Sequence, residues 1–234
     1  MQTNFPLGFD TPDLAVRAQN LAKTYGFSIQ QQTLPRLQLT QDGLVLLIDT
    51  FSPLRVDFAA MFAQRRVDKT HGLIRACKPS PGWTIVDATA GWGRDAGLLA
   101  QYGANVIMLE RQPIMAALLT DGLQRLGATA WHLTCLHQDA YQYLTQLSAQ
   151  DYPDVIYIDP MHPERQKSAL VKKDMQALQQ LFGPNSNVPD LLSLALRKAK
   201  KRVVLKWPQK LAPPQVPDIS IEGKTIRFAV YLCV

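Results

Sequence analysis

Three features that identify other classes of protein are missing from this sequence. No apolar run approaches the roughly 20 residues that a membrane-spanning helix needs, and the N-terminus, MQTNFPLGFD, has no basic segment followed by an apolar one. The three cysteines, Cys77, Cys135 and Cys233, are far apart and form no C-x-x-C pair, so neither a disulfide framework nor a zinc site is indicated. We therefore expect a soluble, cytoplasmic protein with no membrane partner and no bound metal.

The size and charge of the chain set further limits. Its 234 residues, 47% of them hydrophobic, suffice for one domain, or for one domain with a small appendage. Lysine and arginine outnumber aspartate and glutamate by 25 to 19, which gives a net charge of +6. Such a charge is compatible with a polyanionic partner such as nucleic acid, but does not by itself identify one.

The most informative stretch is TIVDATAGWGRDAGLLAQYGANVIMLER, which runs from Thr84 to Arg111. Its pattern predicts a strand, a glycine turn, a helix and a second strand. Residues 85–86 are apolar, as in a buried parallel strand, and residues 88–93 are nearly all small, so the backbone can turn sharply and approach a ligand closely. The helix is expected over residues 96–101 and the second strand over residues 106–109, ending at Glu110.

Acidic residues in this stretch separate two nucleotide-binding folds. A dinucleotide site requires G-x-G-x-x-G after the first strand, whereas this turn contains Asp87, Ala90, Gly91 and Gly93 and has no third glycine at the required place. Asp87 would repel a pyrophosphate but would tolerate the cationic sulfonium and amino group of S-adenosylmethionine. Glu110 follows 23 residues later, which suits a carboxylate that binds a ribose diol. The pattern therefore resembles the first motif of class I methyltransferases and predicts these five residues as cofactor contacts.

A second motif, VIYIDPMHP, covers residues 155–163. An apolar strand ends at Asp159-Pro160, and because proline lacks an amide donor and fixes φ, the loop is stiff and its carbonyls can face a cleft. It resembles the Asp-Pro-Pro-aromatic loop of amino-methyltransferases, in which the carboxylate and a backbone carbonyl accept hydrogen bonds from an exocyclic NH2. We therefore predict that Asp159 and Pro160 are catalytic. Met161 and His162 replace the second proline and the aromatic residue of that loop. A nucleobase whose amine is methylated would therefore need another surface to stack on, either His162 or Trp207.

The remaining segments complete an α/β pattern. Residues 1–58 are predicted to form a small α/β appendage, with a helix over residues 11–25 and a hairpin at residues 41–43, which acts as a substrate-binding arm or caps a sheet edge. Residues 59–234 are predicted to form a Rossmann-like class I methyltransferase domain, a seven-stranded, mostly parallel sheet with helices on both faces. Further helices are expected over residues 56–76, 113–126, 166–181 and 190–201, and strands over residues 131–136, 202–206, 219–221 and 225–233.

Two features have alternative interpretations. Asp139 follows the third predicted strand, where it either faces the adenine amino group of the cofactor or N-caps the next helix. Arg65, Arg66 and Lys69 cluster within five positions and form either an RNA contact or a solvated helix face.

The segments DATAGWGRDA, MLERQP and IDPMHPERQKSALVKKDM together resemble the ribosomal RNA small subunit methyltransferase J family, which methylates the N2 amine of one guanine in 16S RNA. The resemblance covers residues 56–234 and implies S-adenosylmethionine as cofactor, and small-subunit RNA or the assembled small subunit as partner. The cofactor contacts that it implies are Arg94, Asp95, Glu110, Arg111, Asp139, Ala140 and Asp159. It also favours Lys167, Lys172 and Lys173 as contacts to RNA phosphates. Together with the basic cluster Arg65, Arg66 and Lys69, these are the predicted RNA-binding residues.

Three other functions remain open at this point. The Asp-Pro loop also permits an amino-methyltransferase that acts on DNA adenine or on a protein glutamine. A nicotinamide-dependent oxidoreductase is disfavoured by Asp87 and by the missing third glycine. A non-catalytic RNA-binding assembly factor with a relict cofactor fold is disfavoured because Asp87, Glu110 and Asp159 are all present.

Overall fold

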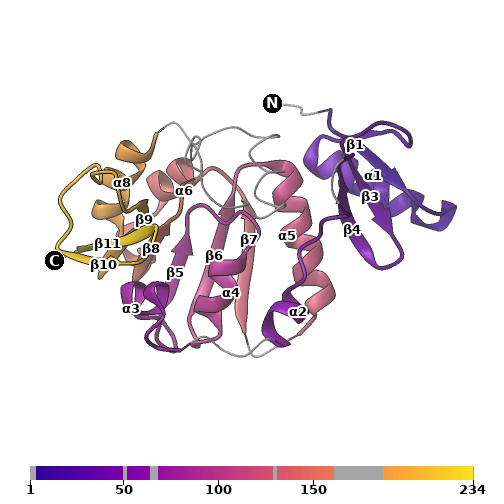
Figure 1. The fold of residues 1–234 in the computed structure, drawn as a ribbon. Helices are drawn as coiled ribbons and strands as arrows, with labels where there is room; N and C mark the ends of the chain where they lie inside the picture. The colour runs from indigo at the N-terminus through magenta and orange to yellow at the C-terminus, as the bar shows by residue number, and fades with distance from the viewer. Residues whose placement is uncertain (1–3, 50–51, 64–67, 129–130, 161–186, 234) are drawn as a thin grey trace. The chain divides into compact units, whose positions relative to one another are not determined.

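The computed structural model describes residues 4–49, 52–63, 68–128, 131–160 and 187–233 (Figure 1). These residues belong to two compact units. Residues 4–49, 52–58 and 112–127 lie in the first unit, and the other described residues lie in the second. The domain boundary between residues 58 and 59 stays a prediction.

The described part of the first unit contains a four-stranded sheet, a short 3-10 helix and two α-helices. The strand order is β2 (Ser28–Ile29), β1 (Pro6–Phe9), β3 (Arg36–Thr40) and β4 (Gly43–Leu47), and only the β3–β4 pair is antiparallel. The short helix η1 (Pro12–Leu14) leads into α1 (Ala15–Tyr25), which ends at Gly26 with φ 75°. The second helix, α5 (Pro113–Leu126), contacts α1 and β4. The predicted N-terminal helix and hairpin are both present.

A buried carboxylate joins α5 to the N-terminal segment of this unit. Asp121 is 3% exposed, and its Oδ1 accepts a hydrogen bond from Arg17 Nη2 at 2.7 Å. Its Oδ2 accepts two more, from Arg125 Nε at 2.8 Å and from the backbone N–H of Leu44 at 3.0 Å. Arg125 also donates to the carbonyl of Val56. Because a buried charge is tolerated only when it is paired and hydrogen-bonded, these contacts explain how an aspartate can lie here.

We expect the substitution Asp121→Asn to destabilise the protein by about 3 kcal/mol. It removes the negative charge that compensates Arg17 and Arg125, and it places the NH2 group of the asparagine against a buried N–H donor, where no hydrogen bond can form. Urea unfolding followed by circular dichroism measures this change. Asp49→Asn is the matched control, since Asp49 is exposed and has no partner among the described residues. An unchanged unfolding midpoint for Asp121→Asn would show that this cluster does not stabilise the fold.

The second unit contains a seven-stranded sheet of order β10, β11, β9, β8, β5, β6, β7. Its parallel part comprises β5 (Thr84–Asp87), β6 (Asn105–Glu110), β7 (His132–His137), β8 (Val155–Ile158) and β9 (Arg202–Pro208). The last two strands, β10 (Ile219–Glu222) and β11 (Ile226–Leu232), are antiparallel and extend the sheet beyond β9. The predicted fold, a mostly parallel seven-stranded sheet, is confirmed.

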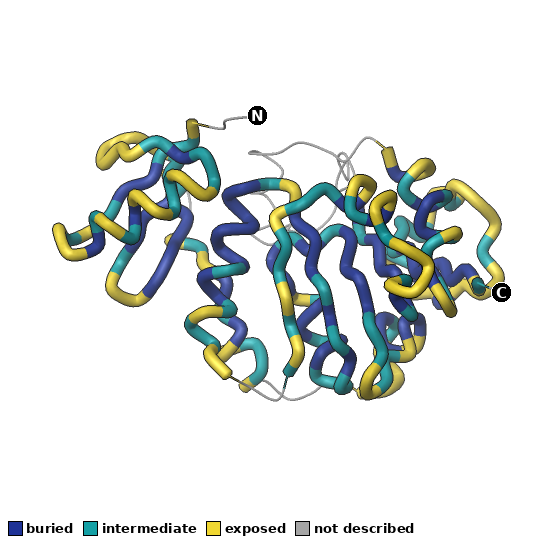
Figure 2. Tube along the Cα trace, turned by 180° about the vertical axis from the view of Figure 1, so that it is seen from behind, coloured by how far each residue is buried: buried dark blue, intermediate teal, exposed yellow. Residues whose placement is uncertain are grey.

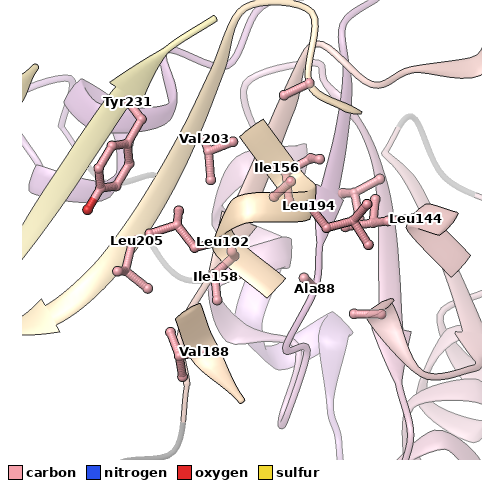
Figure 3. Packing of buried hydrophobic residues seen from close by; sticks show 14 of the residues in the cluster. Ala88, Leu144, Ile156, Ile158, Val188, Leu192, Leu194, Val203, Leu205 and Tyr231 are labelled. Atoms are coloured by element: carbon pink, nitrogen blue, oxygen red, sulfur yellow. The ribbon is translucent and has the colours of Figure 1, made fainter. Parts of the chain in front are cut away.

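Helices cover both faces of this sheet. On one face, α3 (Gly72–Cys77) contacts β9, β10 and β11, and α4 (Arg94–Ala100) contacts β6 and β7. The opposite face carries α6 (Ala140–Gln146) and α8 (Val188–Lys198), whose Leu144 and Leu192 share one buried cluster with Ile156, Ile158 and Val203 (Figure 3). This two-faced cover explains why the central strands are continuous apolar runs in the sequence.

Burial varies regularly across the sheet (Figure 2). Strand β8 is buried at every position and β5 at three of its four positions, whereas β7 at the edge has no buried residue.

A short helix, η2 (Ala149–Asp151), precedes β8. No helix in the described part of the chain is both long enough and apolar enough to cross a membrane.

The single helix predicted over residues 56–76 is wrong. Two helices occupy this region, α2 (Phe58–Ala63) and α3, and residues 68–71 between them form a turn. The Oδ1 atom of Asp68 accepts the backbone N–H of Thr70 at 2.7 Å, and the backbone N–H of His71 bonds to the carbonyl of Asp68 at 2.9 Å. Aspartate stabilises turns by such local bonds, which compete with the helix.

Candidate functional site

The strand order creates a place for a ligand between β5 and β8. From β5 the chain continues to β6 on one side, whereas β8 and then β9 pair on the other side. The order of the sheet therefore reverses at this point. In open α/β sheets, ligands bind in the crevice at the carboxyl ends of the strands where the order reverses.

A glycine turn occupies one side of this position. The backbone N–H of Gly91 donates to Glu110 Oε2 at 3.1 Å, and that of Ala90 donates to the carbonyl of Leu109 at 3.2 Å, so the turn is held against the end of β6. Gly91 and Gly93 have φ values of 53° and 71°, which residues with a Cβ rarely adopt. Glu110 is recessed, with 8% of its surface exposed.

Asp87 ends β5 directly beneath this turn and is almost fully buried, with 1% exposed. Its Oδ1 accepts the backbone N–H of Thr89 at 3.1 Å. Burial, together with the nearby Asp95 and Asp159 carboxylates, raises the pKa of Asp87 to about 8, although that hydrogen bond and Lys206 oppose the shift. The environment of Asp87 therefore favours its neutral form when no cationic ligand is bound.

A cluster of charged side chains lies on the other side, beside the loop that follows β8. Lys206 Nζ of β9 is 2.6 Å from Asp159 Oδ2 and 3.2 Å from Asp95 Oδ2 of α4. Tyr157 of β8 donates its hydroxyl to the same Asp95 oxygen at 2.6 Å. The backbone N–H of Asp159 donates to Thr89 Oγ1 at 2.6 Å, which joins the β8 loop to the glycine turn. The two predicted motifs therefore form one site.

The electrostatics of this cluster favour a lysine cation and a readily protonated carboxylate. Desolvation raises the pKa of Asp159 to about 6, with Lys206 opposing the shift and Asp95 adding to it. Desolvation lowers the pKa of Lys206, but the two carboxylates outweigh it and raise that pKa above its usual value. Burial and the Asp95 charge raise the pKa of Tyr157 well above its usual value, so its hydroxyl stays a donor.

The other predicted cofactor contacts follow the carboxyl ends of β5, β6 and β7, at the same end of the sheet. Arg94 and Asp95 begin α4, directly after Gly93, and Arg111 directly follows β6. Ala140 is the first residue of α6 and is buried. Asp139 N-caps that helix, because its Oδ1 accepts the backbone N–H of Gln142 at 3.1 Å, so the capping interpretation is confirmed. Its contact with the adenine remains a prediction.

One of the six predicted RNA contacts, Lys69, lies in the described part of the chain. Lys69 is exposed in the turn before α3. Outside the described residues lie Arg65, Arg66, Lys167, Lys172 and Lys173, together with Met161 and His162. Trp207, the other proposed stacking surface, donates its Nε1–H to the carbonyl of Ala212 at 3.0 Å.

Three residues of the site do not appear among the sequence-based predictions: Thr89, Tyr157 and Lys206. Lys206 had a recognisable signal, since it is a lysine within the apolar strand VVLKWP. A charge in such a strand needs a partner, and the acids at the ends of neighbouring strands are the obvious ones. Thr89 and Tyr157 gave no comparable signal.

The space and the polar groups around the glycine turn fit a nucleoside cofactor. Among the described residues other than its chain neighbours, the atom nearest to a Cβ placed on Gly91 would be the Thr89 carbonyl oxygen at 3.9 Å, so these residues leave space above the turn. The recessed Glu110 carboxylate borders the same turn and can accept hydrogen bonds from a ribose. Among the described residues, no three histidine, cysteine, aspartate or glutamate side chains are grouped as metal ligands.

Comparisons with known proteins agree with this geometry. The family described as "Putative SAM-dependent methyltransferase" matches residues 20–233. A protein of Legionella pneumophila strain Lens, named ribosomal RNA small subunit methyltransferase J, is 50% identical over 97% of this chain and 95% of its own length. One of the same name from Coxiella burnetii strain Dugway is 40% identical over 99% of this chain and 98% of its own.

A solved structure supports the fold over nearly the whole chain. The crystal structure of a SAM-dependent methyltransferase from Neisseria gonorrhoeae is similar with a TM-score of 0.74 and 28% identity, and the match covers 97% of this chain and 95% of that one. The fold, the glycine turn with its two acids, and these relatives lead to one assignment. The chain belongs to the ribosomal RNA small subunit methyltransferase J family of S-adenosylmethionine-dependent methyltransferases.

Proposed function

We propose that this enzyme transfers a methyl group from S-adenosylmethionine to the exocyclic N2 amine of one guanine in 16S ribosomal RNA. The observation that carries the proposal is the position of Asp159-Pro160, at the carboxyl end of β8 and bonded through Thr89 to the glycine turn. An amine acceptor and a methyl donor would meet there. The names of the relatives support small-subunit RNA as substrate, and the resemblance of the sequence motifs supports the guanine amine. A substrate of this kind would place the enzyme in the cytoplasm.

The cofactor would lie across the glycine turn. Glu110 would accept hydrogen bonds from the ribose hydroxyls, and Asp87, beneath the turn, would face the positive charge of the cofactor. Ala90, Gly91 and Gly93 would keep the turn close to it, with the remaining contacts from Arg94, Asp95, Arg111, Asp139, Ala140 and Asp159. When bound, S-adenosylmethionine supplies an electrophilic methyl group on a sulfonium, so the protein need only align the acceptor.

Asp159 would orient and activate the acceptor amine. The lone pair of a guanine amine is delocalised into the ring, so the amine is a poor nucleophile. Asp159 Oδ2 is held by Lys206, whereas Oδ1 has no hydrogen bond from any described residue. We infer that Oδ1 accepts one N2–H and that the carbonyl of buried Pro160 accepts the other, which turns the lone pair toward the methyl group.

The same carboxylate would receive the proton that the amine loses. As the nitrogen–carbon bond forms, one N2–H proton moves to Asp159, directly or through a water molecule. The Asp159 side chain is 33% exposed, which leaves a way for the proton to reach solvent. Lys206 would position Asp159 and keep it ionised between turnovers.

The target guanine must leave its stack before it reaches Asp159, at a cost of a few kcal/mol. Contacts from lysine and arginine to phosphates would offset that cost and position the RNA without reading its sequence. We propose Arg65, Arg66, Lys69, Lys167, Lys172 and Lys173 for these contacts.

The decisive experiment is methyl transfer from labelled S-adenosylmethionine to small ribosomal subunits that lack the modification, followed by nucleoside analysis. Label in N2-methylguanosine is the expected result. Label in another nucleoside would retain the amino-methyltransferase mechanism and overturn the guanine assignment. Parallel reactions with genomic DNA and with total protein address the DNA adenine and protein glutamine alternatives. Tight cofactor binding without label in any acceptor would favour the non-catalytic RNA-binding factor.

The pH dependence of the reaction tests the role of Lys206. Because Asp159 must be ionised to accept the proton, activity should rise with pH through the pKa of that carboxyl, about 6 without the cofactor and lower beside its sulfonium. Lys206→Met removes the cation that lowers this pKa. The acidic limb of the pH–activity profile, where activity rises as Asp159 ionises, should therefore move to higher pH. We expect the kcat of this variant to fall roughly tenfold at pH 7 and to recover partly at pH 8.5.

Two variants control for this result. Asp95→Asn removes a negative charge that raises the pKa of Asp159, so it should move the acidic limb in the opposite direction. Lys210→Met removes an exposed lysine and should leave the profile unchanged. If Lys206→Met lowers activity by the same factor at every pH, Lys206 has only a structural role.

A further inference from the structure

A cavity lies at the end of the same sheet that is opposite to the methyl-transfer site. Its volume is about 500 Å³, and it is lined by residues of α3, β10 and β11 and by the segment that leads into β5. Ile74, Ile221 and Val230 line it with apolar surface, and all three are buried. Ile219, which pairs with Val230 across the two strands, also lines it and is 44% exposed. The cavity therefore has an apolar floor that reaches the protein surface.

The remaining wall of this cavity is cationic. Lys69, Arg75, Lys78 and Arg202 all line it, and none of the lining residues among those that the structure describes is acidic. The side chains of Lys69, Arg75 and Lys78 are exposed and have no hydrogen bond or ion pair with any described residue. Arg202 donates through Nη1 to the carbonyl of Ala76 at 3.2 Å, while its buried Nε has no partner in the described part of the chain. These four positive charges lack compensating acids in the lining.

The position of this cavity separates it from the methyl-transfer site. Arg202 begins β9, whereas Lys206 lies four residues further along the same strand, about 13 Å away at the usual rise per residue. Pro79 and Ser80 of the cavity precede β5, whose opposite end carries Asp87. In Figure 1, α3 accordingly lies at the lower end of the sheet. A ligand in this cavity would be neither the cofactor nor the target base.

We propose that this cavity holds an unpaired nucleotide of the substrate RNA, outside the methylation target, and that it anchors the RNA on the enzyme. The inference rests on the proposed function. The base would lie on the apolar floor and beside Tyr102, which also lines the cavity. The flanking phosphates would contact Lys69, Arg75 and Lys78. Of the sequence-predicted RNA contacts, Lys69 would then act from this cavity.

The combination of surfaces favours RNA over other anionic partners. Proteins that bind single-stranded RNA pair a cationic track for the phosphates with apolar or aromatic surface for the bases. A purely electrostatic contact with a phosphate would not require the apolar floor, and a purely apolar partner would not require four cations. The volume lies within the range of about 300–1,000 Å³ that is usual for sites that enclose a small molecule or a comparable group.

The test compares two triple variants that each remove three positive charges. The cavity variant carries Lys69→Gln, Arg75→Gln and Lys78→Gln, and the control carries Lys23→Gln, Lys210→Gln and Lys224→Gln at other exposed positions. The probe is a fluorescent single-stranded oligoribonucleotide whose affinity is measured over a range of salt concentrations. We expect the cavity variant to bind the RNA about 10- to 100-fold more weakly. The slope of log affinity against log salt concentration should become shallower by about 2, since each phosphate contact to a single strand contributes roughly 0.7 to it.

Equal losses in the two triple variants would overturn the proposal, because they would indicate only a general effect of net charge. Normal binding of naked RNA but weaker binding of small subunits by the cavity variant would also overturn it, in favour of an acidic protein partner. Ile219→Asp gives an independent measurement: it places a negative charge on the floor and should weaken RNA binding, while the affinity for S-adenosylmethionine remains that of the wild type.

Crosslinking distinguishes failure of this inference from failure of the proposed function. Oligoribonucleotides that contain 4-thiouridine should crosslink to peptides covering residues 69–80 or 219–230 of the wild type. If the wild type methylates guanine in small subunits but these peptides carry no crosslink and the cavity variant has a normal KM, the cavity is not an RNA site and the function stands. If the wild type transfers no methyl group to RNA, the proposed function fails, and the binding and crosslinking results still decide the inference.

Discussion

Asp159→Ala is expected to reduce methyl transfer by about 1,000-fold or more, the upper part of the range for loss of a general base together with its orienting contacts. The substitution removes the group that would align the amine and take its proton. It leaves Lys206 paired with Asp95 at 3.2 Å, so the cluster keeps one of its two ion pairs. The measurement is the single-turnover rate with saturating small subunits and cofactor.

Asp159→Asn separates alignment from proton transfer. Asparagine can still accept a hydrogen bond from the amine but cannot take the proton, so we expect its rate to remain at least about 100-fold below the wild type. Both variants should unfold at nearly the wild-type temperature, because Asp159 and Lys206 are partly exposed. Both should bind the cofactor with less than about a tenfold loss of affinity. A rate within tenfold of the wild type for Asp159→Ala would remove Asp159 from the proposed role.

Glu110→Ala is expected to weaken S-adenosylmethionine binding by about 100-fold. Two hydrogen bonds from ribose hydroxyls to a carboxylate contribute about 1.5 kcal/mol each, and their sum of about 3 kcal/mol corresponds to that factor. The substitution also removes the acceptor for the Gly91 N–H, which loosens the turn against β6. Isothermal titration calorimetry with the cofactor alone measures the effect, so the result does not depend on the identity of the methyl acceptor.

Glu110→Gln serves as the intermediate case. Its amide oxygen can still accept the Gly91 N–H, so the turn should keep its place, and a loss of about tenfold is expected from the missing charge. Glu222→Ala is the matched control, since Glu222 is an exposed glutamate of β10. Wild-type affinity in Glu110→Ala would place the ribose elsewhere and would require another cofactor pose.

Local signals in the sequence account for the features that could be predicted. The glycine turn, Asp87 and Glu110 lie in one strand–turn–helix–strand segment, so their arrangement follows from short-range geometry. Asp159-Pro160 was recognisable because an apolar strand ends directly before it. The mostly parallel sheet followed from the alternation of strands and helices, and the antiparallel end from the two late strands.

Contacts between distant segments could not be predicted in the same way. The pairing of Lys206 with Asp159 and Asp95 depends on β9, β8 and β5 being neighbours, and it joins residues 47 and 111 positions apart. Likewise, Asp121 binds Arg17 across 104 positions. The turn before α3 contains a bond from the backbone N–H of Thr70 to the side chain of Asp68, and such local bonds compete with a helical pattern that otherwise looks continuous.

The distance along the sequence between Lys206 and Asp95 also determines when this ion pair can form during synthesis of the chain. At about 5–20 residues per second, a ribosome adds Lys206 on the order of 10 s after Asp95, the residue 111 positions before it. Until then β8, an entirely buried strand in the finished fold, has no β9 beside it and exposes an apolar edge that can pair with other chains. The addition of β9 therefore covers that edge of β8 and brings the counter-charge for Asp95 and Asp159 in the same step, so the nascent chain completes this charged cluster only when β8 gains its second neighbour.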